Sequence, residues 1–135
     1  MPFLIEKLVV YQKALDLAEE LGALTDAFPR GQAYVVDQLN RAALSIATNI
    51  AEGNGRYRKL DRRNFFIISR GSAFECVPIL ELCRRKGLIN AEQHRLLYQR
   101  LEEISKMLSG LINSLPDRLS FDTASPAART SRSIS

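Results

Sequence analysis

Two short polar motifs interrupt apolar stretches of the chain, and their residue types are the best suited to chemistry. Asn49 and Glu52 stand three positions apart, close to one helical turn, and the second motif supplies Arg70, Ser72 and Glu75. A buried polar group destabilises a fold unless it has a hydrogen-bond partner. We therefore expect a structural polar network, formed by these five residues, that fixes the pairing of two helices.

The alternative for the same residues is a ligand pocket, which would require them to converge on an open cavity. Arg70 and Glu75 are five positions apart, about 140° around a helix, so the two cannot face one direction. Gly71 lies between the polar residues. Because glycine costs about 1 kcal/mol relative to alanine inside a helix, it indicates close contact with another helix.

A second group of residues is basic and clustered. Its members are Arg56, Arg58, Lys59, Arg62 and Arg63, with Tyr57 among them. From Arg41 to Arg70 the chain carries seven cations and two carboxylates, an excess of five charges, whereas the net charge of the whole chain is +4. The cluster is either a solvated surface or a phosphate-binding patch for RNA or DNA, with Arg58 and Arg62 exposed.

Catalytic and metal-binding patterns are missing. His94 is the only histidine, and Glu92, two positions away, points about 200° around the helix from it. Cys76 and Cys83 are seven positions apart on one expected helix, roughly 10.5 Å, which is too far for a disulfide. We expect two reduced core cysteines, a surface histidine, no metal, no cofactor and no enzymatic activity.

The elements that must position these residues are helices. Apolar residues recur every three or four positions throughout. The third helix is expected from Leu60 or Asp61 to Lys86, with a kink at Pro78, and its inner stripe is expected at Phe65, Ile68, Ser72, Cys76, Ile79, Leu82 and Cys83. The pattern predicts an all-α fold, an antiparallel up-and-down four-helix bundle with a polar C-terminal tail.

Turn residues separate the helices. Phe28-Pro29-Arg30-Gly31 should end the first helix, and Gly87 should end the third. Gly53-Asn54-Gly55 would supply positive-φ residues after the second helix. Asn90 and Gln93 resemble a capping box at the start of the fourth helix.

One domain, residues 1–115, accounts for the four helices, and residues 116–135 form a Ser/Ala/Pro-rich tail that we expect to be flexible. No apolar run approaches the roughly 20 residues that span a bilayer, and no signal peptide is visible. We therefore expect a cytoplasmic protein without a membrane partner.

Several large apolar residues fall off the expected inner stripes. They are Leu4, Ile5, Val9, Val10, Phe66, Ile67 and Phe74. Exposed apolar residues of this size indicate an interface, so we expect a homo-oligomer.

The segments Ser45-Ile-Ala-Thr-Asn-Ile-Ala-Glu-Gly53 and Ser69-Arg-Gly-Ser72 resemble motifs of a bacterial family of four-helix-bundle proteins, first noticed in intervening sequences of 23S ribosomal RNA genes. Ser69 stands where alanine is usual. Relatives include the accessory variability determinant of diversity-generating retroelements, a pentameric ring that associates with nucleic acid. The resemblance implies a four-helix bundle, a homopentamer and an RNA or DNA partner.

Taken together, these patterns favour a non-enzymatic oligomeric bundle that associates with RNA or DNA through the basic residues. The alternative is a structural or adaptor module that binds a protein partner and has no nucleic-acid role. Binding that falls steeply with salt would favour the first function.

Overall fold

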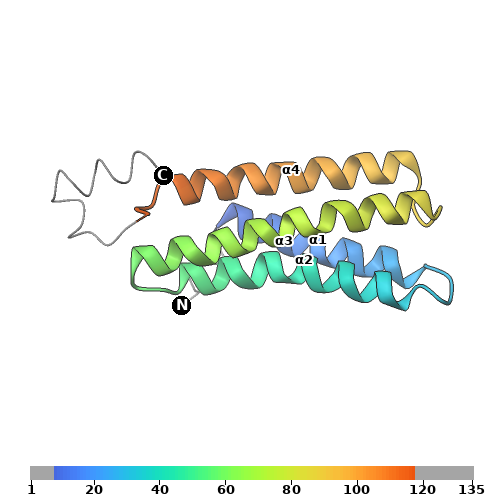
Figure 1. Ribbon diagram of the computed structural model, residues 1–135, viewed down its shortest axis with the longest axis horizontal. Coiled ribbons are helices and arrows are strands. Elements are labelled where there is room, and N and C mark those ends of the chain that lie inside the picture. Colours follow the sequence, from blue (N-terminus) through green and yellow to red (C-terminus); the bar gives the residue numbers. More distant parts are fainter. Residues whose placement is uncertain (1–7, 118–135) are drawn as a thin grey trace.

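The structure, a computed structural model, describes residues 8–117. Four helices make up this part of the chain: α1 (Val9–Asp26), α2 (Ala33–Asn54), α3 (Lys59–Arg85) and α4 (Ala91–Asn113). Each packs lengthwise against the next, and α4 returns to α1 (Figure 1). The predicted antiparallel four-helix bundle is confirmed. Most of the predicted tail, along with Leu4 and Ile5, lies outside the described residues.

The helices do not contact each other equally. Among the helices that are neighbours in the bundle, α2 and α3 have the most extensive contact, followed by α3–α4 and α1–α2, and α1 and α4 have the least. Two ion pairs connect this weakest seam, one between Lys13 and Glu103 at 2.7 Å and one between Arg100 and Glu20. The close α2–α3 pair is therefore the part of the fold that positions both polar motifs.

The core is a single apolar cluster to which all four helices contribute. Its largest fully buried side chains are Leu17, Leu21, Leu39, Ile46, Ile50, Leu80, Leu101, Ile104, Leu108 and Ile112. Burial of a leucine or isoleucine contributes about 1.5–3 kcal/mol relative to exposure, so this cluster is the main source of stability.

The expected inner stripe of α3 was partly wrong. Ile68 and Leu82 are exposed, whereas Phe66 and Leu80 are buried. Apolar residues occur on more than one side of α3, so periodicity alone did not identify the inward face. Two of the residues that we expected off the inner stripes, Phe66 on α3 and Val10 on α1, also belong to the core.

Three of the predicted helix ends are confirmed. Gly31 and Gly87 adopt positive φ angles of 93° and 76°. At the start of α4, Asn90 accepts a hydrogen bond from the Gln93 backbone N–H, and Gln93 accepts one from the Asn90 N–H, which completes the capping box.

The positive φ angles expected after α2 were wrong. α2 continues through Asn54, and Gly55 has a φ of −82°. Gly53 is needed for space instead, because a Cβ atom there would lie 2.9 Å from Cε1 of Phe66 and 3.0 Å from Cβ of Phe65. This close approach brings the end of α2 against the start of α3.

Pro78 does not interrupt α3, which is continuous from Lys59 to Arg85. Proline removes the hydrogen bond to the carbonyl four residues earlier. Pro78 and Phe74 are both on the exposed side of α3, where water can solvate that carbonyl.

Candidate nucleic-acid interface

The two polar motifs meet at the seam between α2 and α3. Asn49 Nδ2 donates to the carbonyl of Ser45 at 2.9 Å and to its hydroxyl at 3.0 Å, and the hydroxyls of Ser45 and Ser72 are 2.8 Å apart. One turn away, Ser69 Oγ donates to the buried carbonyl of Ile46 at 2.7 Å. The Ser45–Ser72 and Ser69–Ile46 bonds connect the two helices.

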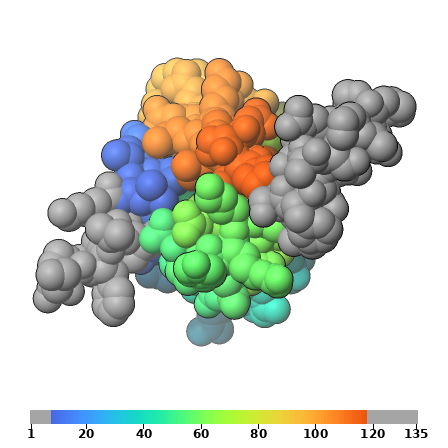
Figure 2. Space-filling model, turned by 90° about the vertical axis from the view of Figure 1, so that its left-hand side faces the viewer, coloured from blue at the N-terminus to red at the C-terminus, as the bar shows by residue number. Residues whose placement is uncertain are grey.

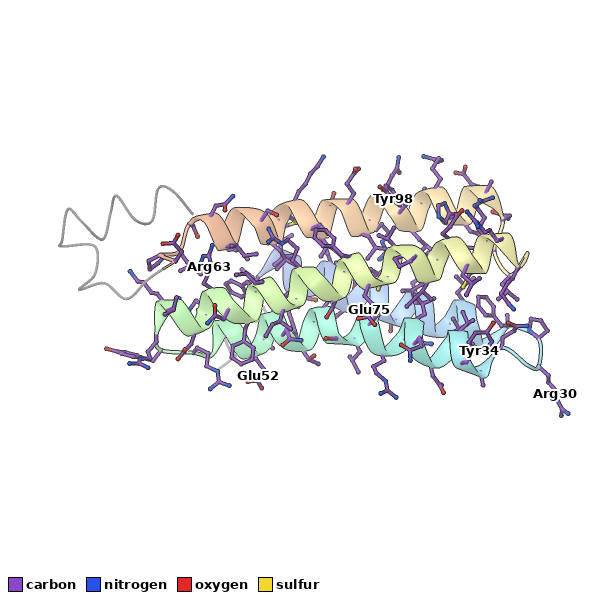
Figure 3. All side chains as sticks on the ribbon, in the orientation of Figure 1. Arg30, Tyr34, Glu52, Arg63, Glu75 and Tyr98 are labelled. Carbon is purple, nitrogen blue, oxygen red and sulfur yellow. The ribbon has the colours of Figure 1, made fainter. Side chains whose placement is uncertain are left out.

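The other three expected members lie elsewhere. Arg70 donates to Ser109 of α4 at 3.0 Å, and Glu52 pairs with Arg56 on the exposed side of α2. Glu75 is exposed on α3 (Figure 3). Of the five expected members, only Asn49 and Ser72 take part, and Ser45 and Ser69 are the members that sequence reasoning missed. Nor does Gly71 make the expected close contact, since a Cβ atom there would meet nothing within 4 Å.

The basic residues gather at one end of the bundle, around the connection between α2 and α3. We call this part, residues 55–63, the basic end. Figure 2 looks onto it, with the green connection facing the viewer below the orange end of α4. Its five cations do not share one environment.

Arg56 and Arg62 brace the connection. The Arg56 guanidinium lies 4.6 Å from the centre of the Phe65 ring and 3.0 Å from the Glu52 carboxylate. Arg62 is half-buried, contrary to the expected exposure, because its Nη2 donates to the Arg56 carbonyl at 2.9 Å. The two arginines therefore hold the backbone that carries Tyr57 and Arg58.

Arg62 and Arg63 also carry buried hydrogen-bond donors. The Nε atom of each is buried and has no hydrogen-bond partner among residues 8–117. Arg63 lies on the side of α3 that faces α4 (Figure 3). Because both atoms are buried, neither is accessible to a phosphate at the surface.

Tyr57, Arg58 and Lys59 form the open tip of the basic end. Tyr57 is 98% exposed, the highest fraction of any large apolar side chain described. Arg58 and Lys59 are exposed, and neither forms an ion pair with any residue between 8 and 117. Asp61, in the first turn of α3, is the nearest acidic residue in sequence.

The opposite end of the bundle has charges of a different kind. Glu81 accepts hydrogen bonds from Arg84 at 2.9 and 2.7 Å and from Arg85 at 3.1 Å, which lower its pKa to about 2. His94 Nε2 is 3.6 Å from the same carboxylate and is mostly buried, so it is not the surface residue that we expected. Lys86 donates to the Tyr34 hydroxyl at 3.0 Å.

A groove runs between α3 and α4 on the side of the bundle. It has a volume of about 420 Å³ and is lined chiefly by Phe74, Val77, Tyr98 and Leu101, with Glu102 and Lys106 at its edge. Phe74 is 56% exposed and Tyr98 44% exposed. We call it the α3/α4 groove.

Other chemistry has little support in the described residues. Within residues 8–117 no group of three or more histidine, cysteine or acidic side chains could hold a metal ion. Burial raises the pKa of the Cys76 thiol to about 12, with a smaller contribution from the nearby Glu75 carboxylate, so this cysteine is a poor nucleophile. No described helix is long and apolar enough to cross a membrane.

The fold and the basic end define a small four-helix-bundle protein that carries unpaired cations at one end. The chain belongs to the 23S rRNA-intervening sequence protein family, whose model matches residues 6–110. A solved structure from Bacteroides thetaiotaomicron, described as a protein of unknown function from the S23 ribosomal protein family, is similar to it. That protein is 28% identical, with a TM-score of 0.71 over 76% of this chain and 97% of the other. No curated protein matches the chain.

Proposed function

We propose that this protein is a non-enzymatic, oligomeric bundle of the cytoplasm that associates with RNA or DNA through the basic end. The observation that carries the proposal is the open pair Arg58 and Lys59 beside Tyr57. Arg58 and Lys59 differ in this from Arg84 and Arg85, which pair with Glu81, and from Arg62, which donates to the Arg56 carbonyl. Two adjacent cations left open on a braced connection are available to phosphates.

The exposed guanidinium of Arg58 and the exposed ammonium of Lys59 fit the same ligand chemistry. Phosphate oxygens accept strong charge-assisted hydrogen bonds from arginine. Phosphates also recur along any nucleic-acid strand, so such contacts give affinity with little preference for sequence. The family name, which refers to sequences within 23S rRNA, is consistent with a nucleic-acid partner.

Charge reversal tests this function directly. The variant Arg58→Glu/Lys59→Glu changes the open cations only, whereas Arg62 is left in place because it braces the connection. The matched control is Arg30→Glu/Arg41→Glu, which makes the same change in charge at two exposed positions away from the basic end.

We expect the first variant to lose binding to short RNA and DNA strands at low salt, while the control binds nearly as the wild type does. Equal binding by both variants would show that the cations of the basic end are only a solvated surface. Circular dichroism should give the same helicity for all three proteins.

The oligomer is proposed from exposed apolar side chains on the outer side of α2 and α3. Leu44, Ile68 and Leu82 are each at least 40% exposed, and Gly71 on the same helix has free space beside it. Isolated side chains of this kind are common on monomers, but several on one side of a bundle favour an interface. A homopentamer is the state that the family resemblance implies.

Light scattering on the wild type and on Ile68→Asp tests the oligomer. We expect the wild type to have several times the monomer mass and Ile68→Asp to be smaller, with unchanged helicity. Glu75→Asp, an exposed substitution on the same helix, is the control. A monomeric wild type at micromolar concentration would overturn the oligomer and leave the nucleic-acid proposal to be judged separately.

An adaptor that binds a protein partner is the second candidate function. The α3/α4 groove favours it, because two exposed aromatic rings flank an apolar floor. Loss of a protein partner in Phe74→Ser, together with nucleic-acid binding that no variant of the basic end alters, would make this function the leading one.

A further inference from the structure

The tip of the basic end has a property that phosphate contacts alone do not require. Tyr57 is 98% exposed, so both faces of its ring are open to solvent. Its neighbours along the chain are Arg56 and Arg58, and Lys59 follows. An aromatic ring among cations is the combination that proteins use to bind single strands, in which the bases stack and the phosphates pair with the cations.

The backbone that carries this ring is fixed. The Gly55 N–H donates to the Ala51 carbonyl at 3.1 Å, and the Arg56 N–H donates to the Gly53 carbonyl at 3.1 Å. The Arg62 guanidinium holds the Arg56 carbonyl from the other side. A held connection reduces the backbone conformational entropy that would be lost when a ligand binds at Tyr57.

Tyr34 is also an exposed tyrosine beside a cation, but its ring and hydroxyl already have a partner. Tyr34, at the opposite end, is 57% exposed, but Lys86 donates to its hydroxyl and lies 5.5 Å from its ring centre. The Tyr34 ring and the Lys86 ammonium are therefore already paired with each other. Tyr57 has no ring contact or hydrogen bond with any residue between 8 and 117, so a ligand is the available partner.

We propose that the tip of the basic end binds unpaired nucleotides, with a base stacked on Tyr57 and the flanking phosphates on Arg58 and Lys59. This rests on the proposed function and narrows its ligand to single-stranded RNA or DNA. In a duplex both faces of each internal base are covered by neighbouring bases, so only an unpaired base can offer its face to the ring. Because every base has such a face, the site tolerates any sequence.

The variants Tyr57→Ala and Tyr57→Leu test the stack. Each should weaken binding of single-stranded oligonucleotides by roughly 5- to 150-fold and leave duplex binding unchanged, whereas Tyr57→Phe should bind as the wild type does. Leucine retains apolar surface without the ring, so it separates stacking from burial. Parallel titrations with RNA and DNA strands of one sequence distinguish the two sources of unpaired nucleotide.

A tryptophan reports the contact independently, since the chain contains none. The emission of Tyr57→Trp should be quenched by a single strand but not by a duplex, and the emission of Tyr34→Trp, the control at the opposite end, should not change with either.

If the wild type binds single strands and duplexes equally, and Tyr57→Ala changes neither, the stacking inference is overturned while the phosphate proposal stands. If the wild type binds no nucleic acid even at low salt, both are overturned.

Discussion

The two ends of the bundle carry similar numbers of arginines and lysines but use them differently. At the end formed by the α1–α2 and α3–α4 connections, Arg84 and Arg85 share the Glu81 carboxylate, Arg95 pairs with Glu92 and Lys86 contacts Tyr34. At the basic end only Arg56 has a carboxylate partner among the described residues. Arg30, at the opposite end, is exposed and forms no ion pair within residues 8–117, so the two ends differ in degree: the basic end has two adjacent open cations beside an exposed ring.

The two ends also close differently. Gly87 ends α3 with a positive φ, and a capping box starts α4. The α2–α3 connection has no positive φ, and Arg58, the N-cap of α3, makes no side-chain capping bond. Arginine side chains hold the backbone there instead. Local sequence signals therefore describe one end well and the other poorly.

The largest expected effect comes from glycine substitution at each end. Gly53→Ala places a methyl group 2.9 Å from the Phe66 ring and should destabilise the fold by about 1–3 kcal/mol. Gly87→Ala should cost about 1–2 kcal/mol through its positive φ, because nothing lies near its Cβ position. Chemical denaturation measures both. Asparagine tolerates positive φ, so Gly87→Asn should be more stable than Gly87→Ala, whereas Gly53→Asn should not be more stable than Gly53→Ala. The same change in stability at both positions would show that the two glycines are not needed for different reasons.

The next largest effect on stability is expected from Arg62, whose guanidinium holds the Arg56 carbonyl at the basic end. Arg62→Ala removes the donor to the Arg56 carbonyl and should cost about 1 kcal/mol. Faster hydrogen exchange at the Gly55 and Arg56 amides, which donate to the Ala51 and Gly53 carbonyls, would show that the connection has loosened. Arg84→Ala at the opposite end is the control, since its partner Glu81 retains Arg85. Unchanged exchange in Arg62→Ala would mean that the connection is held by other contacts.

A smaller difference in stability is expected between two substitutions on α2, one at Asn49 and one at Glu52. Asn49→Ala leaves Ser45 without one of its partners and should cost about 1 kcal/mol. Glu52→Ala removes only an exposed ion pair and should cost less than about 0.5 kcal/mol. Thermal unfolding of both variants checks the order, and a larger loss in Glu52→Ala would show that the carboxylate is a structural member after all.

The smallest effect is an acid dependence confined to the end that holds Glu81. Hydrogen bonds from Arg84 and then Arg85 lower its pKa from 4.5 to about 2. Because the folded-state pKa is lowered, the interaction stabilises the fold fully above pH 4.5 and is lost as the pH falls through about 2. Glu81→Gln should flatten the stability profile in that window. The same profile in wild type and variant would contradict the pairing.

The sequence was sufficient for the architecture because spacing, caps and turn residues are local signals. It predicted the four helices, the ends of the first and third at Gly31 and Gly87, and the capping box of Asn90. It oriented α3 wrongly, with Ile68 in the core and Phe66 outside it, because apolar residues lie on more than one side of that helix. Packing partners, which are long-range, decided between them.

The candidate site was predictable as a cluster but not as an arrangement. The cations and Tyr57 could be found by counting charge along the chain. That Arg62 would turn to the Arg56 carbonyl, and that Gly53 would serve a neighbouring ring, depends on how two helices meet in space. No local motif encodes such contacts.

The central claim is that Arg58 and Lys59 contact phosphates, and the salt dependence of binding measures this most directly. Each phosphate contact to a single strand contributes about −0.7 to the slope of log affinity against log salt. For each protomer engaged, Arg58→Ala/Lys59→Ala should therefore make the slope shallower by about 1.4, whereas Arg30→Ala/Arg41→Ala should leave it unchanged. A slope that is the same in the wild type and in both variants would contradict the account.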